Sequence, residues 1–174
     1  MTFNETIISQ LQFAQWAAMR NLEGVTHEDS VVRPAGGGND GNWVLGHVIA
    51  VRNRLLPGLG ETPPWDDERI RSYVAESSDD TSARVPFDEL VDAFSKTHEL
   101  MIAGIARLDE QALAQKAPFS PGKPNPEETL QSLLTKIVVH ESYHIGQMGM
   151  LRRSMGKEGA IRVPARPVAA AAAS

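Results

Sequence analysis

Four segments of the chain place apolar residues three and four positions apart, the spacing that gives a helix one apolar face. They span residues 2–23, 43–56, 86–108 and 126–156. No segment alternates apolar and polar β-branched residues, as a half-buried strand would. Amphipathic helices joined by loops bury their apolar faces against one another, so the pattern predicts an all-α, antiparallel four-helix bundle.

Capping residues give the expected helix starts. Thr2 and Glu5 have the spacing of a capping box, in which each side chain accepts from the other residue's backbone N–H. Asn42 is the predicted cap of the second helix, and Asn125 that of the fourth, with Pro126 in its first turn.

The stretch 57–85 is long for a structureless loop, so we expect a short helical turn within it. Residues 1–156 are predicted to form a single helical domain, because 174 residues suit one domain and Gly156 is a typical helix stop. Residues 157–174 are predicted to be a C-terminal tail of low complexity.

Charge and composition exclude several classes of partner. The net charge is -5 and the 17 lysines and arginines are scattered, so the chain lacks the basic patch of a nucleic-acid-binding protein. No apolar run approaches membrane-spanning length, and the first residues do not resemble a signal peptide, so we expect a cytoplasmic protein. The chain has no cysteine, so any metal must be held by His, Asp, Glu or water.

Histidines carry the strongest functional signal. His140 and His144 are four residues apart, which places both imidazoles on one face of a helix, with Cβ atoms roughly 5–6 Å apart. That face is the inward one, because Ile137 and Leu151 project the same way. His47 lies on the inward side of another helix. A ligand pair on one helix and a single ligand on a facing helix is how bundles build metal sites.

Three imidazoles suit zinc, nickel, cobalt, iron or manganese, and three protein ligands leave a position open for water or substrate. The run from His140 to His144 also fits HExxH, in which Glu141 would be the general base of a metallopeptidase. That alternative is less favoured, since no histidine follows His144 and Glu158 is the only acidic residue after Glu141.

Other polar and aromatic residues admit two readings each. His98 lies on the apolar stripe of the third helix, where a hydrogen-bonded core histidine is more frequent than a fourth ligand. Gln147 is close in angle to the histidine pair and is predicted either to orient a ligand or to pack in the bundle. Trp43 and Trp65 could wall a substrate cavity, although core or dimer contacts are more frequent for such residues.

Two motifs resemble the DinB and YfiT-like superfamily of metal-binding helical bundles. They are Trp43-Val44-Leu45-Gly46-His47 and His140-Glu141-Ser142-Tyr143-His144-Ile145-Gly146-Gln147, followed by Leu151-Arg152-Arg153 and Gly156. In that family the histidine four residues after the tryptophan and both histidines of the second motif are the ligands. The resemblance implies an up-down-up-down bundle, often dimeric, with zinc or nickel at the site.

Characterised relatives in that superfamily include transferases that use a low-molecular-weight thiol, a thiol-dependent isomerase and proteins described as hydrolases. The sequence therefore predicts a metal-dependent enzyme acting on a small molecule, by S-transfer or by hydrolysis with Glu141 as a candidate base. A fold does not determine a reaction, so a non-catalytic metal-binding or sensor module is the alternative from another class.

Overall fold

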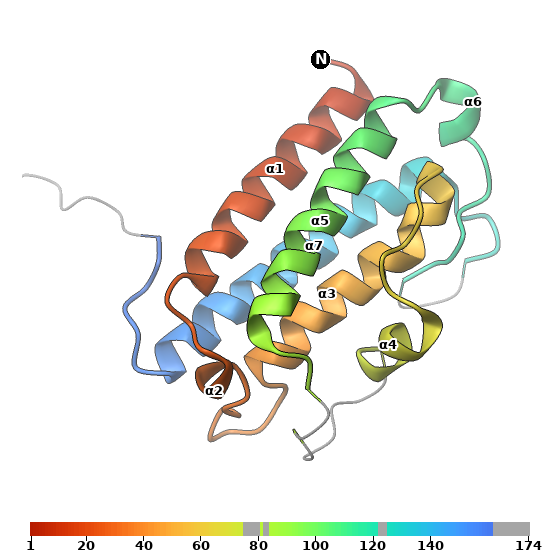
Figure 1. Ribbon diagram of the computed structural model, residues 1–174. Coiled ribbons are helices and arrows are strands. Elements are labelled where there is room, and N and C mark those ends of the chain that lie inside the picture. Colours follow the sequence, from red (N-terminus) through yellow and green to blue (C-terminus); the bar gives the residue numbers. More distant parts are fainter. Residues whose placement is uncertain (75–80, 82–83, 122–124, 162–174) are drawn as a thin grey trace, which may run out of the picture.

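The chain is all-helical in the computed structural model, which describes residues 1–74, 81, 84–121 and 125–161. Figure 1 shows four long helices side by side: α1 (Phe3–Leu22), α3 (Gly41–Leu55), α5 (Phe87–Ala106) and α7 (Leu130–Ser154). Short elements lie in the connections: α2 (His27–Ser30), the 3-10 helix η1 (Leu56–Leu59), α4 (Asp67–Ser72) and α6 (Glu110–Leu113). The described residues contain no β-strand, only an isolated bridge between Lys116 and Thr129. The predicted fold class is thus confirmed as all-helical.

Each long helix packs on two of the others. α1 contacts α5 and α7, and α3 contacts the same two helices. The short helix α4 packs on α3, as Figure 1 also shows. This arrangement brings the second and fourth predicted helices, which carry the three histidines, into direct contact.

The core consists of two apolar clusters. One surrounds the first half of α3 and includes Trp43, Tyr73 and Met148, and the other surrounds its last turns and includes Leu55 and Ile137. Most members of both clusters are almost fully buried, which is the main favourable contribution to folding. On α7 the histidine pair lies in sequence between Ile137 and Met148, and hence between the two clusters.

The predicted cap is confirmed at the start of α1 and wrong at the start of α3. The capping box of Thr2 and Glu5 is present, with both reciprocal hydrogen bonds. The second helix starts earlier than predicted, because the Asp40 carboxylate accepts from the backbone N–H of Trp43 at 2.7 Å and caps the helix instead of Asn42. Asn42 is fully buried and bonds to other parts of the chain.

The predicted start of the fourth helix is wrong. Asn125 accepts from the N–H of Glu127, so its side chain stabilises a local turn rather than a helix. The helix begins at Leu130, where Thr129 and Ser132 form a capping box. Sequence alone did not separate these two uses of a short polar side chain, because both satisfy a nearby backbone N–H.

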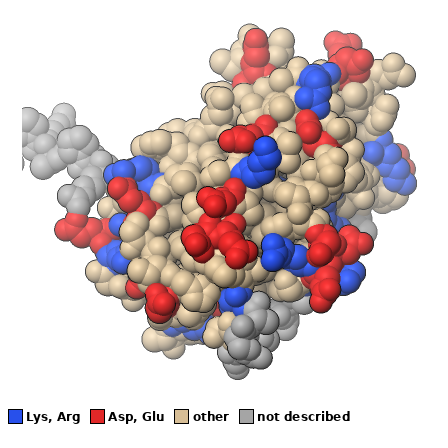
Figure 2. Space-filling model, viewed as in Figure 1, with Lys and Arg blue, Asp and Glu red and all other residues tan. Residues whose placement is uncertain are grey.

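The connection after α3 agrees with expectation, whereas the short helices α2 and α6 lie in connections where none was predicted. α3 gives way at Leu56 to the 3-10 helix around Pro57, and the turn expected within residues 57–85 is α4. Residues 162–174, most of the predicted tail, lie outside the described residues. None of the described helices is long and apolar enough to cross a membrane. Acidic and basic side chains are interspersed on the face seen in Figure 2.

Candidate metal centre

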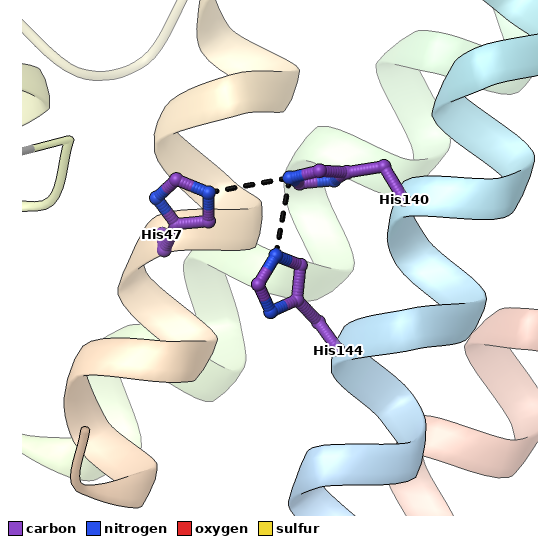
Figure 3. Close-up of side chains that lie close together, drawn as sticks. All are labelled: His47, His140 and His144. Atoms are coloured by element: carbon purple, nitrogen blue, oxygen red, sulfur yellow. Dashed lines mark hydrogen bonds between the residues drawn. The ribbon is translucent and has the colours of Figure 1, made fainter. Parts of the chain in front are cut away.

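The three predicted histidines converge between α3 and α7. Figure 3 shows His47 reaching from α3 toward His140 and His144 of α7. The Nε2 atom of His140 lies 3.2 Å from that of His47 and 3.1 Å from that of His144. One ligand atom from each ring lies within 4.8 Å of the others, so the group could hold a metal ion. His144 is buried, and the other two rings are half-buried.

In His47 and His144, the hydrogen bond made by Nδ1 determines which ring nitrogen carries the proton. His47 Nδ1 lies 2.7 Å from the carbonyl oxygen of Tyr73, and His144 Nδ1 lies 2.7 Å from the side-chain oxygen of Gln147. Both oxygens can only accept, so both Nδ1 atoms donate. In a neutral ring the Nε2 atom then has a free lone pair. Two such lone pairs therefore face His140.

His140 completes the set of donors. Its Nδ1 atom is buried and has no hydrogen-bond partner among the described residues. Its Nε2 atom faces two acceptors, and a single proton there could be donated to only one of them. Metal–nitrogen bonds of about 2.0–2.1 Å separate two ligand nitrogens by about 2.9 Å at a right angle and about 3.3 Å at a tetrahedral angle. The two separations from His140, 3.1 and 3.2 Å, fit a shared divalent ion.

Burial keeps the three rings neutral. It is the main cause of a lowered pKa at His47, His140 and His144. For His140 the pKa falls to about 3, with the two neighbouring imidazoles adding to the effect of burial. At the other two, the shift is opposed by the hydrogen bonds that His47 donates to the Tyr73 carbonyl and His144 to the Gln147 side-chain oxygen. Neutral imidazole is the form that binds metal, so the site is prepared for a cation at neutral pH.

Neighbouring side chains hold the ligands. Trp43, one turn before His47 on α3, stacks on its ring with centroids 4.8 Å apart and planes 11° apart. Both Trp43 and Trp65 belong to the same buried cluster. Gln147 bonds to His144 and donates to the Tyr143 hydroxyl at 3.4 Å. This is the contact that the predicted orienting role of Gln147 requires.

Glu141 follows His140 in the sequence, but its side chain is paired with Arg52. Its carboxylate accepts from Arg52 Nε at 2.8 Å and from Nη2 at 2.8 Å, and both side chains are almost completely buried. Arg52 also donates to the Phe94 carbonyl and contacts the Phe94 ring. Catalysis by Glu141 stays a prediction, but both of its oxygens are engaged by Arg52, which counts against a role as general base.

Arg52 was not singled out in the sequence. Its position could have indicated its role, because Arg52 lies on the same buried stripe of α3 as Val48 and Leu55. A charged residue on a buried stripe requires a buried partner of opposite charge. Glu141 has the same property on α7.

His98 does not belong to the histidine group. It lies on α5, and its Nδ1 atom is buried without a hydrogen-bond partner among the described residues. Its pKa is lowered to about 4, mainly by burial and also by Arg52, whereas Glu141 and Glu99 act in the opposite direction. His98 is half-buried, and its place outside the histidine group gives no support to a role as fourth ligand.

Fold and site together define a class: an all-helical protein with a candidate three-histidine metal site between two of its long helices. The family model described as DinB superfamily matches residues 10–148, a range that includes all three histidines. The chain belongs to the DinB superfamily. A search of curated proteins finds none that matches this chain.

Proposed function

We propose that this protein is a divalent-metal-dependent enzyme in which His47, His140 and His144 hold the ion. The observation that carries the proposal is the convergence of three Nε2 atoms while the outer nitrogens of His47 and His144 are tied to acceptors. Hydrogen-bonded outer nitrogens are typical of metal-binding histidines. Zinc and nickel suit three imidazoles best, and iron, cobalt or manganese would also be accepted.

The proposed substrate site is a groove that Gln147 lines and that the three histidines do not line. It has a volume of about 590 Å³ and runs between the loop before α3 and the second half of α7. Its walls include Pro34, Asn39, Val44, Tyr143, Gln147 and Met150. Gln147 links it to the centre through its bond to His144. This volume is in the range of small-molecule sites, and the uncharged walls favour an apolar, neutral portion of the substrate.

The chemistry proposed for this site is activation of a nucleophile. A divalent ion held by three imidazoles would lower the pKa of a thiol or a water molecule at its open side. In S-transfer, the thiolate attacks an electrophilic carbon and forms a C–S bond, the leaving group departs with its electron pair, and the thiol proton goes to solvent. The thiol comes from a low-molecular-weight cosubstrate, since the chain has no cysteine.

S-transfer is favoured over hydrolysis by the state of Glu141. Attack by water is assisted by a nearby base, and the carboxylate next to His140 is already paired with Arg52. A thiol has a pKa near 8.5 and loses its proton far more readily than water. The same pairing argues against the HExxH metallopeptidase.

The experiment is an assay of the zinc-loaded and nickel-loaded protein with the electrophile monochlorobimane and a panel of low-molecular-weight thiols. We expect consumption that requires both thiol and metal and disappears in His144→Ala. Turnover of ester or amide substrates that is indifferent to thiol would instead identify a hydrolase. Ser142→Ala is the control, because Ser142 is exposed on α7 and, among the described residues, its hydroxyl donates only to the Val138 carbonyl.

The second candidate is a metal-binding or sensor protein without turnover. It is favoured by one observation: the Glu141 carboxylate, the acidic group next in sequence to His140, is paired with Arg52. Metal binding at the expected stoichiometry, with no reaction of any thiol or ester tested, would support this candidate against the enzyme.

We also propose that the four long helices alternate in direction as an up-down-up-down bundle and that the protein is a cytoplasmic homodimer. For the dimer, support comes from one side of α7, where Val139, Tyr143 and Met150 expose 70%, 64% and 73% of their surface. Tyr143 and Met150 also line the groove, so the partner would cover part of it. Exposed apolar stripes of this kind often mark protein contacts.

A further inference from the structure

Gly46, the residue before His47, lies against the ring of Tyr73. A Cβ atom added at Gly46 would lie 2.2 Å from both Cδ1 and Cε1 of that ring. This is far inside the van der Waals contact distance, and the ring is only 1% exposed, so it has little room to move away. The glycine therefore allows the aromatic ring to approach the backbone of α3 beside the ligand.

Tyr73 is also fixed at its hydroxyl. The hydroxyl donates to the side-chain oxygen of Asn42 at 3.0 Å and accepts from the backbone N–H of Val85 at 3.0 Å. Asn42 in turn donates to the Val85 carbonyl at 2.9 Å. Three chain segments meet at this hydroxyl: the first turn of α3, the residue after α4, and the approach to α5. Burial raises the pKa of the hydroxyl, which therefore stays protonated and able to donate.

The backbone carbonyl of Tyr73 contacts the candidate metal centre. Its carbonyl oxygen accepts from His47 Nδ1 at 2.7 Å. The short helix α4 that precedes Tyr73 has no buried residue of its own. The position of this carbonyl consequently depends on how the Tyr73 ring and hydroxyl are seated on α3.

We propose that Tyr73 is a positioning residue for the metal centre, and that seating of the segment from Trp65 to Tyr73 on α3 is linked to metal binding at His47. This inference rests on the proposed metal site. When this segment packs on α3, the Tyr73 carbonyl accepts from His47 Nδ1. The proton of His47 then stays on Nδ1 and the lone pair on Nε2, which favours metal binding. By linkage, a bound ion stabilises the seated segment by the same free energy.

Two variants test the link. In Gly46→Ala the added methyl displaces the Tyr73 ring, and we expect zinc affinity to fall about 10- to 100-fold, the usual effect of losing a group that orients a ligand. Tyr73→Phe keeps the ring and removes only the hydroxyl bonds, and we expect a smaller loss of about 3- to 10-fold. Gly149→Ala is the matched control on α7, because its new Cβ would make only ordinary contacts, the nearest at 3.5 Å from Asn21.

Zinc affinity is measured by competition with a chromophoric chelator, after circular dichroism has shown that each variant is folded. Long-range ¹⁵N spectra of the metal-free protein supply a readout that general destabilisation would not move. We expect the Nδ1-protonated pattern to be lost at His47 and kept at His144 in Gly46→Ala. Hydrogen exchange supplies the reciprocal readout: zinc should slow exchange of the Ile70 and Tyr73 amides in the wild type.

The outcomes separate the two proposals. If the wild type binds no zinc, nickel, cobalt, iron or manganese, the proposed metal site is wrong. If the wild type binds metal but Gly46→Ala and Tyr73→Phe bind it as tightly as Gly149→Ala does, the positioning role of Tyr73 is overturned. Loss of affinity in Gly46→Ala with an unchanged His47 ring spectrum would overturn it too.

Discussion

Replacing Glu141 by glutamine removes one charge from the centre of the bundle and changes the side-chain volume very little. In the structure the carboxylate accepts two hydrogen bonds of 2.8 Å from Arg52, and the two side chains are 2% and 1% exposed. An amide has one acceptor oxygen, so its NH₂ group would face a guanidinium N–H, donor against donor. In the variant, Arg52 thus stays buried and loses one of its two hydrogen bonds to residue 141.

The expected cost follows from this geometry. Removing one partner of a buried ion pair costs about 3–5 kcal/mol. Arg52 would keep its bond to the Phe94 carbonyl at 2.8 Å and its position 4.0 Å above the Phe94 ring. We therefore expect a loss at the lower end, about 3 kcal/mol, which is a large share of the stability of an ordinary domain.

Urea unfolding of the metal-free protein at pH 7 measures this loss. Glu99→Gln is the control on α5, because the side chain of Glu99 is 70% exposed and its ion pair with Lys96 is a surface one; a change within about 0.5 kcal/mol is expected. The double variant Arg52→Met, Glu141→Leu should recover to within about 1 kcal/mol of the wild type, since apolar residues can replace a buried pair.

Metal content distinguishes the structural role of Glu141 from a catalytic one. We expect Glu141→Gln to retain the wild-type stoichiometry, because its carboxylate faces Arg52 rather than the histidines. A variant that is as stable as the wild type and binds metal, yet has lost all turnover, would refute this reasoning and identify Glu141 as the base.

Three further predictions concern other parts of the chain. The pKa of His98 is lowered from 6.5 to about 4, so the wild type loses stability as the pH falls below 6.5. Between pH 6.5 and 4.5, the free energy of unfolding of metal-free His98→Gln, measured in urea, should fall by about 1–2 kcal/mol less than that of the wild type. Equal losses would contradict the lowered pKa. Asp40→Ala should cost about 3–5 kcal/mol in the same assay, because it removes both the cap of α3 and the buried partner of Arg84, which donates to the Asp40 carboxylate at 2.9 Å; a loss below about 1 kcal/mol would contradict both roles. Met150→Glu should shift the proposed dimer toward monomer in analytical ultracentrifugation, whereas an unchanged mass would place the interface elsewhere.

The parts of the fold that could be predicted from sequence depend on local periodicity. Apolar residues recurring every three to four positions identified the long helices, and the four-residue spacing of His140 and His144 placed both rings on one face. His47 joined them because it lies on the apolar side of its own helix. These predictions needed no knowledge of distant contacts.

The rest depends on contacts between distant residues. Arg52 and Glu141 are 89 residues apart, and nothing in either segment specifies the other as its partner. Tyr73 is 26 residues from His47 and acts through a backbone carbonyl, which every residue type has. The starts of α3 and α7 were misplaced because several short polar side chains nearby could each cap a helix or stabilise a turn.

Metal stoichiometry by elemental analysis is the most direct test of the three-histidine site. The wild type, His47→Ala, His140→Ala and His144→Ala are purified alike, loaded with zinc or nickel, and freed of excess metal by gel filtration. We predict about one ion per chain in the wild type and loss of the ion from each variant, because two imidazoles seldom retain a divalent ion. Near-stoichiometric metal retained by any of the three variants would contradict the site.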